Sequence, residues 1–185
     1  MSLTPSNMLA LGTKAPTFEL LDTVSGESKA LDNLSSDKGT MIMFICNHCP
    51  YVIHLNEEIV KVANEYQAKG INFIAISSND VANYPADSPD KMTQVAKDLN
   101  YPFPYLYDES QEVAKAYDAA CTPDFYLFNG QQELYYRGRF DGSTPGNGVA
   151  ITGEDLKGAM DNLLEGGSAG ESQKPSMGCN IKWKR

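Results

Sequence analysis

The feature that most constrains this chain is a change in hydrophobic periodicity on either side of Pro50. Residues 40–45 form a short apolar run, which is typical of a strand buried on both faces. From Pro50, apolar side chains recur at steps of three and four residues, which predicts an amphipathic helix that ends before Gly70. Residues 71–77 form a second apolar run. Because helical crossovers join parallel strands, this strand, helix, strand order predicts an α/β fold.

Further segments extend this sheet and cover it. Two hairpins are expected, and Asn129-Gly130 is a strong turn signal in the second of them. Thr152 is expected to cap a last helix that closes near Leu164. The expected hairpin strands are residues 18–22 with 29–34 and residues 125–128 with 133–140, and two more helices are expected around residues 92–99 and 113–117. The sequence therefore predicts a central mixed β-sheet flanked by helices.

The length and composition indicate one domain followed by a C-terminal tail. The chain has 185 residues, and residues 1–165 contain all the predicted helices and strands up to the last helix. Residues 166–185 begin with a stretch rich in Gly and Ser, which predicts a flexible tail. Its end is expected to dock through Ile181 and Trp183.

Charge and hydropathy argue against several classes of partner. The chain has 15 Lys and Arg residues against 24 Asp and Glu residues, a net charge of −9. Nucleic acids and anionic membranes need a positive patch, so we expect neither as a partner. The longest apolar run, residues 41–46, is far shorter than a membrane span. The N-terminus has no basic segment followed by an apolar one, which favours a cytoplasmic location.

The candidate functional site is the sequence Cys46-Asn47-His48-Cys49, which lies where the first buried strand meets the first long helix. Free amide hydrogens and the helix dipole favour a thiolate at such a junction. We expect Cys46 to act as the nucleophile and Cys49 to resolve the resulting mixed disulfide. His48 would add positive charge and stabilise the thiolate further.

Two other interpretations of the pair stay open at this point. Buried cysteines can act as small hydrophobic side chains. Alternatively, a metal could bind, either zinc at all four cysteines or a metal held for delivery by Cys46, Cys49 and a histidine. The remaining two cysteines, Cys121 and Cys179, lie far apart in the chain and lack the short spacing of a second ligand pair.

Three sequence blocks carry a resemblance to a known family. They are Cys-x-x-Cys after a buried strand, Thr-Pro-Asp-Phe-Tyr-Leu-Phe at residues 122–128, and Phe-Pro-Tyr-Leu-Tyr-Asp at residues 103–108 followed by Val-Ala-Lys-Ala-Tyr at residues 113–117. In this order they resemble the thioredoxin-fold redoxins of the alkyl hydroperoxide reductase and thiol-specific antioxidant (AhpC/TSA) branch. The resemblance implies a thioredoxin-like fold with an inserted helical segment.

The resemblance also implies an activity and a substrate-binding edge. The implied activity is thiol–disulfide exchange with a dithiol or disulfide protein or a small thiol, without a metal or organic cofactor. Pro123 would be a cis-proline that faces the cysteine pair and keeps its backbone open to a substrate chain. Thr122 would present backbone groups to that chain.

An antioxidant peroxidase that reduces peroxide is the first alternative activity. Peroxiredoxins carry Pro-x-x-x-Thr-x-x-Cys, and aligning their cysteine with Cys49 puts Cys46 and Ile42 where the Thr and Pro should be. Arg137 or Arg139 could replace the arginine of such a site. On an edge strand, however, each is more often a solvated charge.

The other two cysteines are predicted to differ in role. Cys121 is expected to pack in the core. Cys179 lies on a tail long enough to reach the Cys46–Cys49 pair, so it is a candidate auxiliary or resolving cysteine. The alternative is a docked tail whose cysteine is incidental. His54 is expected to be a surface or boundary histidine.

Overall fold

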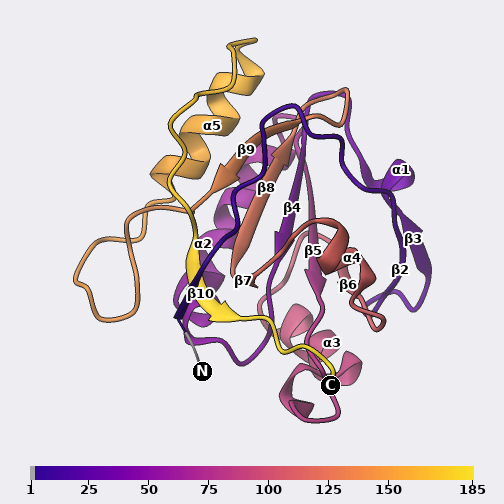
Figure 1. Cartoon of the computed structure of the whole chain (residues 1–185). Helices are drawn as coiled ribbons and strands as arrows, with labels where there is room; N and C mark the ends of the chain where they lie inside the picture. The colour runs from indigo at the N-terminus through magenta and orange to yellow at the C-terminus, as the bar shows by residue number, and fades with distance from the viewer. Residues whose placement is uncertain (1–2) are drawn as a thin grey trace.

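The computed structural model describes residues 3–185, and a seven-stranded mixed sheet forms its centre (Figure 1). The strand order is β3-β2-β6-β5-β4-β8-β9. The pairs β4–β5 and β5–β6 are parallel, and the other neighbours are antiparallel. The strands are β2 (Glu19–Asp22), β3 (Ser28–Ala30), β4 (Thr40–Phe44), β5 (Asn72–Ser77), β6 (Tyr105–Tyr107), β8 (Asp124–Phe128) and β9 (Leu134–Gly138).

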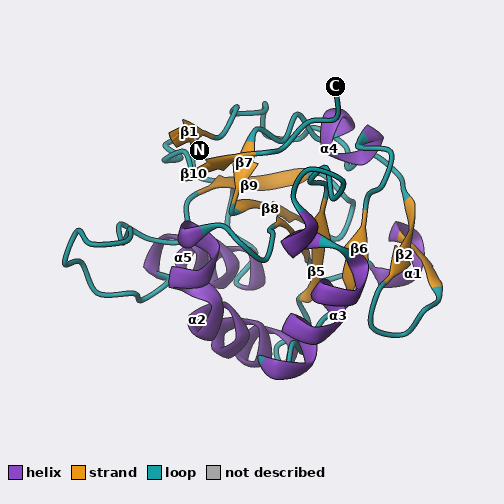
Figure 2. Cartoon of the chain, turned by 90° about the horizontal axis from the view of Figure 1, so that it is seen from below, coloured by secondary structure: helices purple, strands orange, loops and turns teal. Residues whose placement is uncertain are grey.

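Helices cover both faces of the sheet. Figure 2 shows α2, α3 and α5 together on one side. The helices are α1 (Leu31–Leu34), α2 (Pro50–Gln67), α3 (Pro89–Asp98), α4 (Glu112–Ala116) and α5 (Glu154–Leu164), with a 3₁₀ turn, η1 (Pro85–Asp87), before α3. None of the helices in the described part of the chain combines the length and apolar character needed to cross a bilayer.

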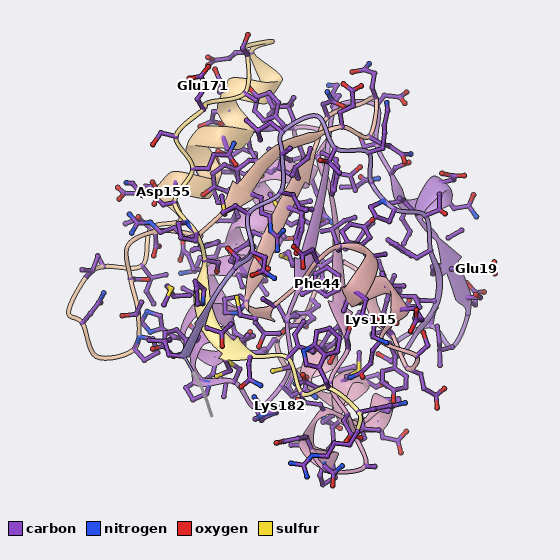
Figure 3. All side chains as sticks on the ribbon, in the orientation of Figure 1. Glu19, Phe44, Lys115, Asp155, Glu171 and Lys182 are labelled. Atoms are coloured by element: carbon purple, nitrogen blue, oxygen red, sulfur yellow. The ribbon has the colours of Figure 1, made fainter. Side chains whose placement is uncertain are left out.

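Strand β4 shows how the apolar run produces this layering. Its alternate side chains point to opposite faces, so Met41 and Met43 pack towards α2 and α5, while Ile42 and Phe44 pack towards α1 and α4. All five residues of β4 are buried. In Figure 3, Phe44 lies in the interior, whereas the charged side chain of Glu171 projects at the periphery. The buried run at residues 40–45 is therefore confirmed as the central strand.

Most of the predicted elements are confirmed, with several differences. Residues 31–34 form α1 instead of continuing the hairpin strand. The short strand β6 was not expected, although it joins β2 to β5 within the sheet. The prediction that Thr152 caps α5 is wrong, because the N-cap is Gly153 in a left-handed conformation with φ of 68°. Phe140 approaches within 3.0 Å of where a Cβ of Gly153 would lie, so a larger residue would fit poorly.

The C-terminal segment forms part of a second, three-stranded sheet. This sheet has the order β1-β10-β7 and consists of β1 (Leu3–Pro5), β10 (Met177–Asn180) and β7 (Cys121–Thr122). Before β10 the chain runs beside β9, where the Arg139 amide donates to the carbonyl oxygen of Lys174. After β10, Ile181 is buried but Trp183 stays 41% exposed. The docking expected at Ile181 is thus observed, and the domain boundary at residue 165 stays a prediction.

Candidate active site

The cysteine pair lies where β4 is followed by α2. Cys49 is the N-cap of α2, with an extended backbone (φ −73°, ψ 121°), and Pro50 fills the first helical position. Proline suits that position because its missing amide hydrogen would have no partner inside the helix. Cys46 is 2% exposed and Cys49 is not exposed at all. The local sequence therefore places Cys49 at the N-cap of α2 and Cys46 in the turn just before it.

The Thr122–Pro123 segment faces both sulfurs. The bond between Thr122 and Pro123 is cis, as the family resemblance implied. The Sγ of Cys46 lies 3.4 Å from Oγ1 of Thr122, and the Sγ of Cys49 lies 3.3 Å from the carbonyl oxygen of Thr122. The edge of β7, however, is paired with β10, in a register that places Cys179 opposite Thr122. The backbone expected to receive a substrate chain is thus bonded to the protein's own C-terminal strand.

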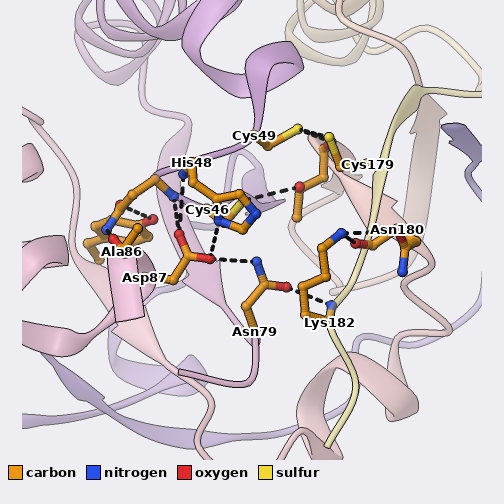
Figure 4. A network of polar contacts seen from close by, with 12 residues as sticks. Cys46, His48, Cys49, Asn79, Ala86, Asp87, Cys179, Asn180 and Lys182 are labelled. Carbon is orange, nitrogen blue, oxygen red and sulfur yellow. Dashed lines mark hydrogen bonds and ion pairs between the residues drawn. The ribbon is translucent and has the colours of Figure 1, made fainter. Parts of the chain in front are cut away.

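A third sulfur approaches the pair from this strand. The Sγ of Cys179 lies 2.7 Å from the Sγ of Cys49 (Figure 4). Cys121, the adjacent residue on β7, does not take part: its thiol is fully buried and points to the carbonyl oxygen of Pro123 at 3.8 Å. Burial raises the pKa of the Cys121 thiol, which keeps it protonated and unreactive. The structure thus brings Cys179 to the pair and leaves Cys121 in the core.

Beside the sulfurs, the side chain of Asp87 anchors His48. One carboxylate oxygen accepts the His48 Nδ1–H at 2.6 Å and the Asn79 amide at 2.8 Å. The other oxygen accepts the backbone amides of Asn47 at 2.8 Å and His48 at 3.3 Å. The His48 ring also stacks on Tyr84, with the centroids 5.6 Å apart. Figure 4 shows this network beside Cys46.

Asp87 is the important residue of the site that the sequence did not reveal. It lies in η1, a short polar turn between two prolines, and has no spacing motif relative to the cysteines. Only the packing of η1 against the β4–α2 junction brings the carboxylate beneath His48. The available signal was weak: an acidic residue just before α3, in a segment otherwise suited to a loop.

The three sulfurs have different affinities for protons. The pKa of Cys49 is lowered to about 5, chiefly by a hydrogen bond from Cys46 and further by the Cys179 thiol and the Val52 amide. The Cys46 pKa is raised by that same hydrogen bond, by burial and by the negative charge of Asp87. Burial and the hydrogen bond to Cys49 raise the pKa of Cys179 to about 12. The lowered pKa favours a thiolate on Cys49, the helix N-cap, although the sequence had favoured Cys46.

Arg137 corrects an expectation about the edge strand β9. Its side chain was expected to be solvated, but it is fully buried. The guanidinium pairs with Asp124 at 3.1 Å and lies 4.4 Å above the ring of Tyr126. The guanidinium also donates to the carbonyl oxygen of Asp118 at 2.8 Å, and the Gln173 side chain, from the segment before β10, accepts the Arg137 amide at 2.7 Å. Burial raises the pKa of Asp124 to about 6, against the opposing charge of Arg137.

Arg139 and His54 lie on another side of Pro123. The guanidinium of Arg139 pairs with Asp155 of α5 at 2.6 Å, and His54 contacts the Ser143 hydroxyl at 3.2 Å. Both line a cavity of about 80 Å³ that also reaches Pro123. No cysteine is among the residues that line this cavity. The geometry therefore gives Arg139 a partner in α5 rather than a sulfur.

The structure also tests the metal interpretation. Among the described residues, one group of metal-type ligand atoms lies within 4.8 Å of one another, contributed by Cys46, His48 and Asp87. Within this group, His48 Nδ1 and Asp87 are hydrogen-bonded to each other, and Asp87 accepts three further hydrogen bonds. A metal would have to displace these donors, so the set fits a hydrogen-bonded network better than a metal site.

Solved structures resemble the chain over most of its length. An uncharacterized conserved protein from Geobacillus kaustophilus is 55% identical, with a TM-score of 0.98 and coverage of 100% of this chain and 97% of that one. A hypothetical protein from Sinorhizobium meliloti 1021 is 43% identical, with a TM-score of 0.95 and 98% coverage of both chains. A putative thioredoxin from Neisseria meningitidis is 25% identical, with a TM-score of 0.63 and coverage of 83% and 91%.

Sequence comparison gives the family. A search of curated proteins returned no significant match. The profile of the AhpC/TSA family matches residues 11–140, which include β2 to β9 and the whole Cys46–Cys49 segment. With its thioredoxin-like mixed sheet and this match over more than half of its length, the chain belongs to the AhpC/TSA family.

Proposed function

We propose that the protein is a thiol–disulfide oxidoreductase whose redox couple is Cys46 and Cys49. The observation that carries this proposal is the hydrogen-bonded sulfur pair at the N-terminus of α2, in which the pKa of Cys49 is lowered to about 5. A thiolate on Cys49 can take up the proton of Cys46, and the Cys46 thiolate formed in this way is the reactive form in disulfide exchange. The putative thioredoxin from Neisseria meningitidis supports the same class of reaction.

In the proposed reaction, the Cys46 proton passes to Cys49 along their hydrogen bond, and the Cys46 thiolate attacks the disulfide of a protein or small-molecule partner. One partner sulfur leaves as a thiolate and takes up a proton. Cys49 then loses its proton, and its thiolate attacks the Cys46 sulfur of the mixed disulfide, which releases the second partner sulfur as a thiol. The Cys46–Cys49 disulfide forms and the partner gains two electrons.

His48 has a positioning role in this proposal. Its ring is fixed by Asp87 and Tyr84 and lies next to Cys46. A protonated imidazole there would stabilise the Cys46 thiolate as it forms. Thr122 and Pro123 would shape the surface around both sulfurs. A cytoplasmic location and a dithiol electron donor stay predictions from the sequence.

The test compares three activities of the purified, reduced protein. We expect turnover in insulin reduction that is lost in Cys46→Ser and in Cys49→Ser and kept in the matched control Cys121→Ser. Hydrogen peroxide should be consumed no faster than by a free thiol, and metal analysis should find no stoichiometric zinc or copper. Rapid peroxide turnover without disulfide exchange would replace the proposal with a peroxidase. Bound metal that quenches thiol reactivity would replace it with a metal site.

A further inference from the structure

The C-terminal strand β10 holds Cys179 firmly against the cysteine pair. On one side β10 pairs with β1, where Leu3 lies opposite Cys179, and on the other side it pairs with β7. At its start, the Ser176 hydroxyl donates to the carbonyl oxygen of Pro123 at 2.6 Å. Just after it, the Ile181 amide donates to the carbonyl oxygen of Ala120 at 3.1 Å. Cys179 is therefore positioned by the fold and does not move freely on a loose arm.

Gly178 shows how closely β10 approaches the active-site backbone. A Cβ on Gly178 would lie 1.9 Å from the carbonyl oxygen of Thr122, so only glycine fits at this position. The neighbouring Cys179 then presents its sulfur to Cys49 at 2.7 Å. The chain thus brings a third thiol to the same edge at which an incoming substrate chain was expected to pair.

Cys49 is the sulfur that contacts both neighbours. Its Sγ lies 2.7 Å from the Sγ of Cys179, and its interactions with Cys46 and Cys179 both lower its pKa. Lys182 follows on the same segment, only 5% exposed, and its positive charge favours a thiolate on Cys179 against the effect of burial. If Cys179 were only a packing residue, its thiol would not need to face Cys49, the sulfur with the lowest pKa. Nor would packing require the buried Lys182 near the Cys179 thiol.

We propose that Cys179 is a third redox-active residue and that Cys49 is shared by two alternative disulfides, Cys46–Cys49 and Cys49–Cys179. This inference rests on the proposed function, which supplies the Cys46–Cys49 disulfide by exchange with a partner disulfide. It goes further in assigning the C-terminal strand as a built-in second partner of the same site.

The two disulfides interconvert by one internal exchange. Cys179 loses its proton and its thiolate attacks the sulfur of Cys49 in the Cys46–Cys49 disulfide. The Cys49–Cys179 bond forms, the Cys46–Cys49 bond breaks, and Cys46 leaves as a thiolate that takes up a proton. No electrons are gained or lost, so the exchange needs no further oxidant. Its result is a free Cys46 thiol.

Disulfide mapping of variants in which one cysteine is replaced tests this proposal. Each purified protein is oxidised with glutathione disulfide, its free thiols are blocked, and its disulfides are mapped by mass spectrometry after digestion. We expect Cys46→Ser to form Cys49–Cys179 and Cys179→Ser to form Cys46–Cys49. Cys49→Ser should form neither and should carry glutathione instead. Cys121→Ser is the matched control and should behave as wild type, with both disulfides present.

The outcomes separate this inference from the proposed function. If Cys46→Ser carries only glutathione adducts while Cys179→Ser still closes Cys46–Cys49, the shared-sulfur proposal is wrong and the oxidoreductase proposal stands. If Cys179→Ser fails to close Cys46–Cys49, the proposed function fails. If Cys46→Ser does not fold, the disulfides mapped in the oxidised wild type test the proposal instead. A Cys49–Cys179 peptide in its digest supports the proposal, and its absence at every ratio of glutathione disulfide to glutathione overturns it.

Discussion

Replacing Asp87 with Asn should both loosen the fold and make Cys46 more acidic. Asn has the shape of Asp, but one of its two terminal groups donates hydrogen bonds instead of accepting them. The remaining oxygen must face the backbone amides of Asn47 and His48, which cannot turn away. The new NH₂ group then faces His48 Nδ1 and the side-chain amide of Asn79, both of which donate to the native carboxylate.

The loss of stability in Asp87→Asn depends on which hydrogen-bond partners of this side chain can adapt. His48 can change its tautomer and accept a hydrogen bond, but Asn79 cannot turn its amide, because its oxygen accepts the Lys182 amide at 2.8 Å. A lost hydrogen bond to a charged group costs about 1.5–3 kcal/mol. The two backbone hydrogen bonds also lose their charge assistance, roughly half of their strength. Together these losses should lower the free energy of unfolding by about 3 kcal/mol.

Urea unfolding of wild type, Asp87→Asn and the control Asp90→Asn measures this loss. Asp90 is exposed on α3, so its replacement should stay within about 0.5 kcal/mol of wild type. Because the charge of Asp87 raises the pKa of Cys46, the pH profile of Cys46 alkylation should move to lower pH in Asp87→Asn. A loss under about 1 kcal/mol, or an unchanged profile, would refute the reasoning about Asp87.

Three further predictions follow from the contacts described above. Because the pKa of Cys49 is lowered to about 5, its thiolate absorbance, measured as wild type minus Cys49→Ser, should persist at neutral pH and disappear as the pH falls through about 5. The matching contribution to stability is complete above the unfolded pKa of about 8.5 and is lost progressively as the pH falls from there to about 5. Arg137→Met should lower the free energy of unfolding in urea by about 3–5 kcal/mol, because it leaves the buried Asp124 without its counter-charge. Adding Asp124→Asn should recover part of this loss. Gly178→Ala should lower the free energy of unfolding by about 2 kcal/mol and abolish the Cys49–Cys179 disulfide. The control Gly170→Ala should do neither, because Gly170 has open space around it. An equal effect of the two substitutions would contradict the close approach of β10.

The parts of the fold that could be predicted are those that depend on local patterns in the sequence. The apolar run before Cys46 and the helical period after Pro50 gave β4 and α2 to within one or two residues. The hairpin at Asn129-Gly130 is confirmed for the same reason, since its turn type depends on adjacent residues. The cap of α5 was missed because Gly153, rather than the expected Thr152, adopts the left-handed conformation there.

The parts that could not be predicted depend on residues far apart in the chain. The length of the tail made Cys179 a candidate, but it is 130 residues from Cys49, and only the pairing of β10 with β1 and β7 brings the two sulfurs together. Arg137 lies on a strand whose edge is covered by a segment more than 30 residues later. Asp87 reaches His48 through the packing of a short turn. No periodicity or spacing in the sequence encodes these contacts.

The sequence by itself determined the type of site: two cysteines at the start of a helix, after a buried strand, in an α/β sheet. Helix and strand periods, turn residues and the Cys-x-x-Cys spacing act over a few residues, so they can be recognised without coordinates. The tertiary structure decided which sulfur has the lowered pKa, which carboxylate orients His48 and whether Cys179 reaches the pair. These depend on burial and on long-range strand register, which arise only when distant segments pack together.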